Sequence, residues 1–328
     1  MDMTLNEFIQ QWQSPCETME VCTSGSTGQP KHIIVKKSSM IASARMTCDF
    51  LGVKKGDKAL ICLPMDYIAG KMMAVRSLVC GLEMIERTPD GHPLKDVDEV
   101  VDFAAMIPLQ VYNSLNVPEE LEKLKKISNL IIGGGPVDDI IIKKLQTFPN
   151  AVWLTYGMTE TLSHIALRKL TGKDASDWYI PFKGVEISVR DDGRLVIFAP
   201  KVNTERLVTN DIAELSKDGK GFKIIGRVDN VINTGGIKVQ MEDVENRLSG
   251  VLNCPFVISK RQDKKFGEVI VLVYESNILL DEKEKIEKLC NSSLPKYLRP
   301  KFYLRIDKIP MTPTGKPNRI KILKFTEQ

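Results

Sequence analysis

Short apolar runs alternate with amphipathic stretches through the first 160 residues of the chain. The apolar runs have the length and composition of buried strands and lie at residues 33–35, 59–63, 84–85, 130–132 and 151–154. Between them, apolar residues recur at helical spacing in residues 38–50, 72–82, 118–127 and 137–147. Residues 100–102 are expected to cap a helix or form a turn. The alternation predicts a parallel α/β sheet, in which ligands bind at the carboxyl ends of the strands.

The pattern changes near residue 185. Short segments at 186–189, 194–197 and 205–208 are separated by turn residues such as Asp192-Gly193, which predicts an antiparallel β patch. After the polar stretch 226–230, helices and strands alternate again, as in a small α+β domain. We therefore expect an α/β fold with two domains. Residues 1–228 would form the larger domain and residues 229–328 a smaller, mobile one.

The composition of the chain argues against several classes of partner and metal. The 328 residues carry 46 lysines and arginines against 42 acidic residues, and the net charge of +4 gives no reason to expect nucleic acid or membrane binding. No run is long enough to span a membrane. Seven scattered cysteines without a Cys-x-x-Cys pair are typical of the reducing cytoplasm. Three histidines without ligand spacing argue against zinc, so any metal should have oxygen ligands.

The clearest chemical signal is the loop from Thr23 to Lys31. It contains Ser24, Gly25, Ser26, Thr27 and Gly28 before it ends on the lysine. Glycines let backbone N–H groups approach phosphate oxygens, while hydroxyls and a lysine add donors and positive charge. The spacing is not that of a Walker loop. A polyphosphate site and a flexible Gly/Ser linker both fit this stretch on its own.

Five segments together resemble one family. They are Thr23 to Lys31, Tyr156-Gly157-Met158-Thr159-Glu160, Thr209-Asn210-Asp211, the stretch from Gly226 to Glu245, and Pro313-Thr314-Gly315-Lys316. In this order they resemble the motifs of the adenylate-forming superfamily, which includes acyl- and aryl-CoA ligases, firefly luciferases and peptide-synthetase adenylation domains. The resemblance covers nearly the whole chain. It implies an enzyme that activates a carboxylic acid with ATP and passes the acyl group to a thiol.

The resemblance implies a set of nucleotide contacts. The loop residues Thr23 to Gly28 and Lys31 would hold the β- and γ-phosphates of ATP, Thr159 would lie near the α-phosphate, and Glu160 would hold Mg²⁺. The adenine would lie between Tyr156-Gly157 and the backbone of Gly133, Gly134, Gly135 and Pro136. Asp211 would accept hydrogen bonds from the ribose, assisted by Arg227. Magnesium held by one carboxylate and phosphates is the usual arrangement.

Three further roles follow from the resemblance. Lys316 would bridge the carboxylate and the α-phosphate, where positive charge matters most in the transition state. Asp229 would be the hinge about which residues 229–328 rotate between an adenylating and a thioester-forming pose. After rotation, Gly235 and Gly236 would line a tunnel for the pantetheine thiol of coenzyme A. The alternative for Lys316 is an ordinary surface lysine.

The chain departs from the family pattern in three places. Only 22 residues precede the phosphate loop, so an N-terminal subdomain is expected to be missing, and a second subunit in a homodimer could complete the site. Asn210 replaces a glycine, although asparagine tolerates glycine-like backbone angles. Tyr67 occupies a position where many members have histidine, which keeps an aromatic wall without the same charge.

Within the superfamily, residues 63–76, 158–164 and 233–239 look most like the 2-succinylbenzoate–CoA ligases of menaquinone biosynthesis. That substrate has an aromatic ring and two carboxylates, so its pocket needs a cation for the carboxylate that does not react. Lys71 and Arg76 are the candidates, with Ser163 and His164 near the ring, and Tyr67 is also expected to bind the substrate. Arg76 could instead lie on a helix surface, and His164 could be an interior histidine without a ligand.

Two other functions stay open from the sequence. A standalone enzyme that loads an amino acid onto a carrier protein would use the same first half-reaction, with Asp66 pairing with the substrate amine. A nucleotide-binding protein without turnover is a third candidate. Retention of both Glu160 and Lys316 argues against the third.

Overall fold

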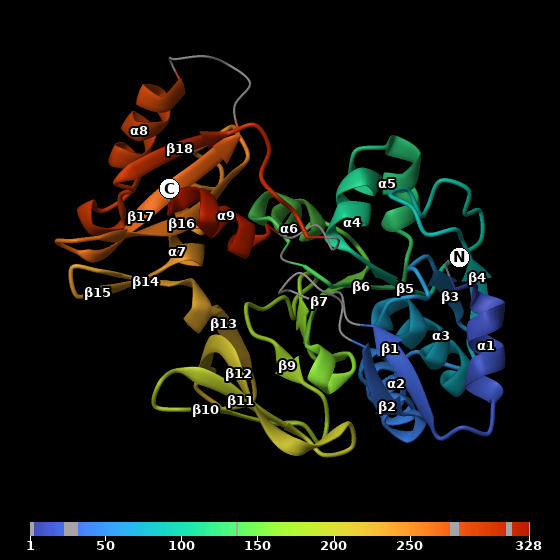
Figure 1. The fold of residues 1–328 in the computed structure, drawn as a ribbon. Helices are drawn as coiled ribbons and strands as arrows, with labels where there is room; N and C mark the ends of the chain where they lie inside the picture. Colours follow the sequence, from blue (N-terminus) through green and yellow to red (C-terminus); the bar gives the residue numbers. More distant parts are fainter. Residues whose placement is uncertain (1–2, 23–31, 136, 276–281, 313–316, 328) are drawn as a thin grey trace.

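A seven-stranded sheet forms the centre of the larger part of the molecule. The computed structural model describes residues 3–22, 32–135, 137–275, 282–312 and 317–327 (Figure 1). The strand order is β4-β3-β5-β6-β7-β8-β9. The strands are β3 (Lys58–Ile61), β4 (Glu83–Glu86), β5 (Phe103–Met106), β6 (Asn129–Ile132), β7 (Ala151–Gly157), β8 (His164–Lys169) and β9 (Ile180–Pro181). The five strands from β4 to β7 pair in parallel, and β8 and β9 add antiparallel edges. The predicted α/β class is confirmed.

Helices cover both faces of this sheet. They are α2 (Lys37–Leu51), α3 (Ile68–Cys80), α4 (Pro108–Leu115), α5 (Pro118–Leu124) and α6 (Asp139–Leu145). Alternate strand residues point to opposite faces, so Ala59 and Ile61 of β3 join one buried cluster and Leu60 joins the other. The first cluster contains buried residues of helices α2 and α3. The second cluster contains buried residues of helices α4, α5 and α6. Burial on both faces explains why the inner strands β3, β5 and β6 are almost continuously apolar.

A small hairpin lies against the first of these two cores. Strands β1 (Thr18–Cys22) and β2 (His32–Lys36) pair antiparallel, preceded by helix α1 (Leu5–Gln13). Thr4 and Glu7 form a reciprocal capping box at the start of α1, and Phe8 is fully buried. Cys22 also forms a parallel bridge with Tyr67, which places the end of β1 beside the start of α3.

The predicted antiparallel patch is present as a four-stranded sheet. It contains β10 (Glu186–Val189), β11 (Arg194–Ala199), β12 (Asn203–Leu215) and β13 (Phe222–Arg227) in that order. β12 is much longer than the predicted 205–208, because register shifts let it continue through polar residues that face solvent. Its far end carries Asp211, opposite Arg227 of β13.

The C-terminal part has its own sheet and core. Its strands are β14 (Val231–Thr234), β15 (Ile237–Gln240), β16 (Phe256–Asp263), β17 (Gly267–Glu275) and β18 (Phe302–Ile306). Helices α7 (Met241–Leu248), α8 (Glu282–Ser293) and α9 (Arg319–Thr326) pack with them, and Figure 1 shows this part joined through β13. Its two buried clusters begin at Ile232. The domain boundary between residues 228 and 229 stays a prediction.

Several elements differ from the expectations. The segment after residues 100–102 is the central strand β5, whose Phe-Ala-Ala-Met sequence has weak strand propensity but is buried on both faces. Helix α4, strand β8, the β14–β15 hairpin and helix α9 were not predicted. Helix α3 begins at Ile68, four residues before the predicted start. Among the described residues no helix is long and apolar enough to cross a membrane.

Gly70 provides a test of the packing that fixes α3. An added Cβ would lie 2.2 Å from the carbonyl oxygen of Pro64, a backbone atom that cannot easily move. Replacing glycine with alanine at an open helical position raises the free energy of unfolding by about 1 kcal/mol. Overpacking at position 70 should instead lower the free energy of unfolding by roughly 1–3 kcal/mol. Urea unfolding of Gly70→Ala measures this loss of stability. The exposed neighbour Ala69→Ser is the control and should change stability by less than about 0.5 kcal/mol.

Candidate active site

Two glycine turns meet at the carboxyl ends of neighbouring strands. Gly133 follows β6, and a Cβ there would lie 2.1 Å from the hydroxyl of Thr155 on β7. Gly134 has a φ of +83°, a left-handed conformation that glycine adopts without strain. At the end of β7, a Cβ on Gly157 would lie 2.4 Å from the carbonyl of Ser163. Glycine at positions 133 and 157 is therefore required by the close packing of Thr155 and of the Ser163–His164 backbone.

Tyr156, Asp211 and Arg227 form one polar network at this edge. The Tyr156 hydroxyl donates to Asp211 Oδ2 at 2.6 Å, and Arg227 Nη1 donates to Oδ1 at 2.8 Å. Burial and the Asp211 charge raise the pKa of the Tyr156 phenol, which therefore remains the donor. The Tyr156 ring also packs edge-on against Phe222 with centroids 5.0 Å apart. The structure thus brings together the three residues that the sequence assigned to adenine and ribose.

The same network reaches the predicted hinge. Asp229 lies in the 3-10 turn η2 (Val228–Asn230), directly after β13. Its Oδ2 accepts from Arg227 Nη2 at 3.0 Å and from the side-chain amide of Asn210 at 3.3 Å. Both donors belong to the antiparallel sheet. The side chain of Asn210, where the family has glycine, therefore adds a contact to this turn.

A sharp turn separates Glu160 from the interior. Thr159 and Glu160 lie in the 3-10 helix η1 (Thr159–Thr161), where Glu160 is exposed and its carbonyl accepts from Asn203 at 3.1 Å. Leu162 follows with a φ of +62°, the positive value being unusual for a leucine, and its side chain is 5% exposed. Core packing of Leu162 compensates for this strain, which costs of the order of 1–3 kcal/mol.

Beyond this turn, a second polar cluster lies inside the protein. Arg76 of α3 is 2% exposed, and its Nη2 donates to Ser163 Oγ at 2.6 Å. Ser163 Oγ is 3.3 Å from His164 Nδ1, and His164 Nε2 is 3.1 Å from Thr47 Oγ1 of α2. The sequence predicted Arg76, Ser163 and His164 together but missed Thr47. No motif in the sequence marks Thr47, because its burial and its contact with His164 come from the tertiary structure.

The charge of Arg76 is poorly compensated. Burial lowers the pKa of its guanidinium to about 10. Its Nε has no hydrogen-bond partner, and none of the ion pairs formed by the described residues includes Arg76. A buried cation without a counter-charge is costly, so an anion that reached it would bind strongly.

Lys71 and Tyr67 lie at the other end of α3. Lys71 is 5% exposed, and its Nζ donates to the carbonyl of Glu20 on β1 at 3.2 Å. Burial lowers the pKa of the Lys71 ammonium. Tyr67 is the N-cap residue of α3, beside Cys22. Both residues therefore contact the strand that leads into the phosphate loop, away from the Arg76 and His164 cluster.

The remaining predicted residues divide into two groups. Gly235 and Gly236 form the tip of the β14–β15 hairpin, with φ values of +57° and +84°. Those that lie outside the described residues are Thr23, Ser24, Gly25, Ser26, Thr27, Gly28, Lys31, Pro136 and Lys316. Their predicted roles stay predictions.

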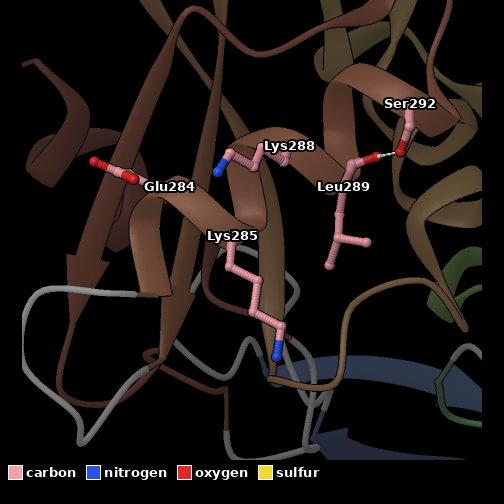
Figure 2. A pocket seen from close by; sticks show the side chains of 5 residues that line it. All are labelled: Glu284, Lys285, Lys288, Leu289 and Ser292. Atoms are coloured by element: carbon pink, nitrogen blue, oxygen red, sulfur yellow. Dashed lines mark hydrogen bonds between the residues drawn. The ribbon is translucent and has the colours of Figure 1, made fainter.

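One hollow in the C-terminal part does not compete with this site. Figure 2 shows one of about 530 Å³ lined by Glu284, Lys285, Lys288, Leu289 and Ser292. All five belong to α8, and the two lysines point in different directions. A single helix cannot surround a ligand, so this hollow is open surface without converging groups.

Comparison with known proteins identifies the family. The AMP-binding enzyme family matches residues 21–208, more than half of the chain. A solved acyl-CoA synthetase (AMP-forming)/AMP-acid ligase II-like protein from Dyadobacter fermentans is 32% identical over 98% of this chain and 93% of its own, with a TM-score of 0.66. The chain belongs to the AMP-binding enzyme family. It is an enzyme of the AMP-forming acid–CoA ligase class.

More distant relatives agree with this assignment. A 2-succinylbenzoate–CoA ligase from Listeria monocytogenes is 25% identical, covering 96% of this chain and 72% of that protein. The solved o-succinylbenzoate CoA synthetase of Bacillus subtilis, in complex with its acyl-adenylate, is 22% identical, covers 92% of this chain and 68% of its own, and has a TM-score of 0.76. At that identity the solved structure supports the fold alone.

A distant solved relative contains ATP and magnesium. The Bacillus subtilis synthetase has also been solved with ATP and a magnesium ion, at a TM-score of 0.75 and 22% identity over 93% of this chain and 69% of its own. Among the described residues here, no group of three or more potential metal ligands exists. One exposed carboxylate, Glu160, is what Mg²⁺ needs when phosphates supply the other ligands.

His164 should make this AMP-binding enzyme sensitive to mild acid. Burial and the nearby Arg76 charge lower its pKa well below the ordinary 6.5. The unfolded chain therefore takes up a proton near pH 6.5 that the folded chain does not. Stability contributed by neutral His164 is complete above that pH and falls below it, by up to about 1.4 kcal/mol per pH unit.

Urea unfolding at pH 7.5, 6.5 and 5.5 measures this slope. His164→Asn should remove this pH dependence of the free energy of unfolding. His32→Asn should leave the pH dependence in place, because the His32 side chain is 65% exposed. Equal pH slopes for the wild type and His164→Asn between pH 6.5 and 5.5 would contradict the neutral buried state.

Proposed function

We propose that this enzyme is an ATP-dependent acid–CoA ligase for an aromatic dicarboxylate, 2-succinylbenzoate being the candidate. One carboxylate attacks the α-phosphate of ATP to give an acyl-adenylate and pyrophosphate. The thiol of coenzyme A then attacks the acyl carbon and releases AMP. The names of the curated relatives support this choice of substrate.

The observation that carries the proposal is the buried guanidinium of Arg76. It has an unpartnered Nε, and none of the ion pairs of the described residues contains it. A monocarboxylate consumed in adenylation would leave this cation uncompensated. A second carboxylate on the substrate would pair with it and turn its burial into binding energy, with Ser163 and His164 beside the ring.

The nucleotide would bind across the ends of β6 and β7. Tyr156-Gly157 and the turn Gly133–Gly135, with Pro136, would enclose the adenine. Asp211 has lone pairs left beyond those used by Tyr156 and Arg227, so it can accept ribose hydroxyls as well. Glu160 would hold Mg²⁺ and Thr159 the α-phosphate, while Thr23 to Gly28 and Lys31 would hold the β- and γ-phosphates. Magnesium would neutralise charge on the departing pyrophosphate.

The second half-reaction would use a rotated C-terminal part. Residues 229–328 would turn about Asp229, which removes Lys316 from the α-phosphate and brings the Gly235-Gly236 hairpin tip toward the acyl group. The hairpin has no side chain at its tip, so a pantetheine thiol could pass close to its backbone. One polar turn, η2, connects the two sheets.

An ATP–pyrophosphate exchange assay with a panel of acids tests the substrate assignment. The panel should contain 2-succinylbenzoate, its single-carboxylate analogues, benzoate, fatty acids and amino acids. Exchange with 2-succinylbenzoate, much reduced for the analogue without the second carboxylate, is the expected result. Activity with amino acids and none with dicarboxylates would overturn it in favour of a carrier-loading enzyme.

Arg76→Ala should raise the KM for the dicarboxylate far more than the KM for ATP. Loss of a charge-assisted hydrogen bond costs about 1.5–3 kcal/mol, which corresponds to roughly a 10- to 100-fold rise. Arg45→Ala on the exposed face of α2 is the matched control. Steady-state kinetics in both substrates measure the split. Equal rises in both KM values would make Arg76 structural.

Lys316→Ala should separate the two half-reactions. Pyrophosphate exchange should fall by several orders of magnitude, because this ammonium would stabilise charge only in the adenylation transition state. Thioester formation from supplied acyl-adenylate and coenzyme A should stay near the wild-type rate. Lys301→Ala, elsewhere in the C-terminal part, is the control. Equal loss of both steps would refute the two-pose account.

A further inference from the structure

A continuous chain of hydrogen-bonding groups connects the Arg76 guanidinium to helix α2. Arg76 Nη2 reaches Ser163 Oγ at 2.6 Å, and Ser163 Oγ is 3.3 Å from His164 Nδ1. His164 Nε2 is 3.1 Å from Thr47 Oγ1, which is 3.2 Å from the carbonyl oxygen of Ser43. Thr47 is fully buried and His164 is 7% exposed, so water does not provide alternative partners.

The two ends of this chain fix the direction of every hydrogen bond. A guanidinium only donates, so Ser163 Oγ accepts from Arg76 and gives its own hydrogen to His164 Nδ1. At the other end a carbonyl only accepts, so Thr47 gives its hydrogen to Ser43. Thr47 Oγ1 must then accept from His164 Nε2. Both conditions require a neutral imidazole with its proton on Nε2.

The other forms of His164 disturb this arrangement. With the proton on Nδ1, Ser163 Oγ would accept from both Arg76 and His164, its own hydrogen would lose the His164 acceptor, and Thr47 would have to turn its hydrogen away from Ser43 toward Nε2. A doubly protonated ring would place a second positive charge next to Arg76 in a buried site. The ring itself is restrained by Phe182, whose centroid lies 5.5 Å away at an interplanar angle of 71°.

We propose that Thr47 is a positioning residue of the acyl site, which sets the tautomer of His164 and thereby keeps the Ser163 hydroxyl as the acceptor that aims Arg76. This role rests on the proposed function of Arg76 as the anchor for the second carboxylate. Without Thr47, the Nε2 proton would have no partner, and the imidazole would move its proton to Nδ1. Ser163 would then turn its own hydrogen elsewhere, and its Oγ would be shared between two donors, His164 Nδ1 and Arg76, which weakens the hydrogen bond that orients the guanidinium.

Thr47→Val tests this role with nearly unchanged volume. The carbonyl of Ser43 still accepts the backbone N–H of residue 47 within α2, so the helix keeps its ladder. Thr47→Ser restores the hydroxyl. Ser77→Ala is the matched control, because Ser77 on α3 is also buried and its hydroxyl also donates to the carbonyl four residues earlier, Met73, at 3.0 Å.

Nitrogen-15 NMR of the imidazole rings reports which ring nitrogen of His164 carries the proton. This tautomer would not change if Thr47 served only to pack the core. The chain has three histidines, so His164→Asn assigns the signal. We expect the Nε2–H tautomer in the wild type, Thr47→Ser and Ser77→Ala, and the Nδ1–H tautomer in Thr47→Val. The dicarboxylate KM of Thr47→Val should rise on the order of tenfold, as for one lost buried hydrogen bond, with the ATP KM unchanged.

Three results would overturn the inference. The first is the Nδ1–H tautomer in the wild type, and the second is an unchanged tautomer in Thr47→Val. The third is a changed tautomer with an unchanged dicarboxylate KM. Failure of the proposed function is recognised separately, because the wild-type enzyme would then turn over no dicarboxylate, and Thr47 would have no acyl site to position.

Discussion

The close pairing of β7 with β8 at Gly157 is the contact on which both halves of the site depend. Gly157 pairs with His164, and a Cβ at that glycine would lie 2.5 Å from the His164 Cα. On the β7 side of this contact, Tyr156 points to Asp211 and Arg227. On the β8 side, Ser163 and His164 reach Arg76. A larger residue at position 157 would separate the Tyr156 network from the Arg76 cluster, which the proposed reaction needs close together.

The charged side chains on the two sides of that pairing differ in whether they have partners. Asp211 is satisfied twice, by a phenol and a guanidinium, so the nucleotide side is neutralised and rigid before a ligand arrives. Arg76 is buried with an unpartnered Nε, so the acyl side holds uncompensated charge. The positive φ of Leu162 lies between them and is held by core packing. Stored strain and unpaired charge at one turn are typical of a binding site.

Much of the candidate site could be predicted from local sequence. The Tyr156 to Glu160 motif, Asp211 and Arg227 follow strands whose apolar runs were recognised, and the structure brings Tyr156, Asp211 and Arg227 into hydrogen-bond contact. Thr47 could not be found in this way, because one threonine in an amphipathic helix has no motif. Strand β5 was also missed, since it is only four residues long and its two central alanines carry little strand preference until two helical layers bury them.

The sequence by itself determined the alternation of most strands and helices in the larger part, the α/β class and the family, because these follow from periodic burial and from motifs that are local in the chain. Tertiary structure alone decided which distant residues meet. Arg76 and Ser163 lie 87 positions apart, and Thr47 and His164 lie 117 apart. Whether Arg76 was a surface or buried residue depended on the packing of α3 beneath β8, since a cation gains or loses its water only when separate elements close around it.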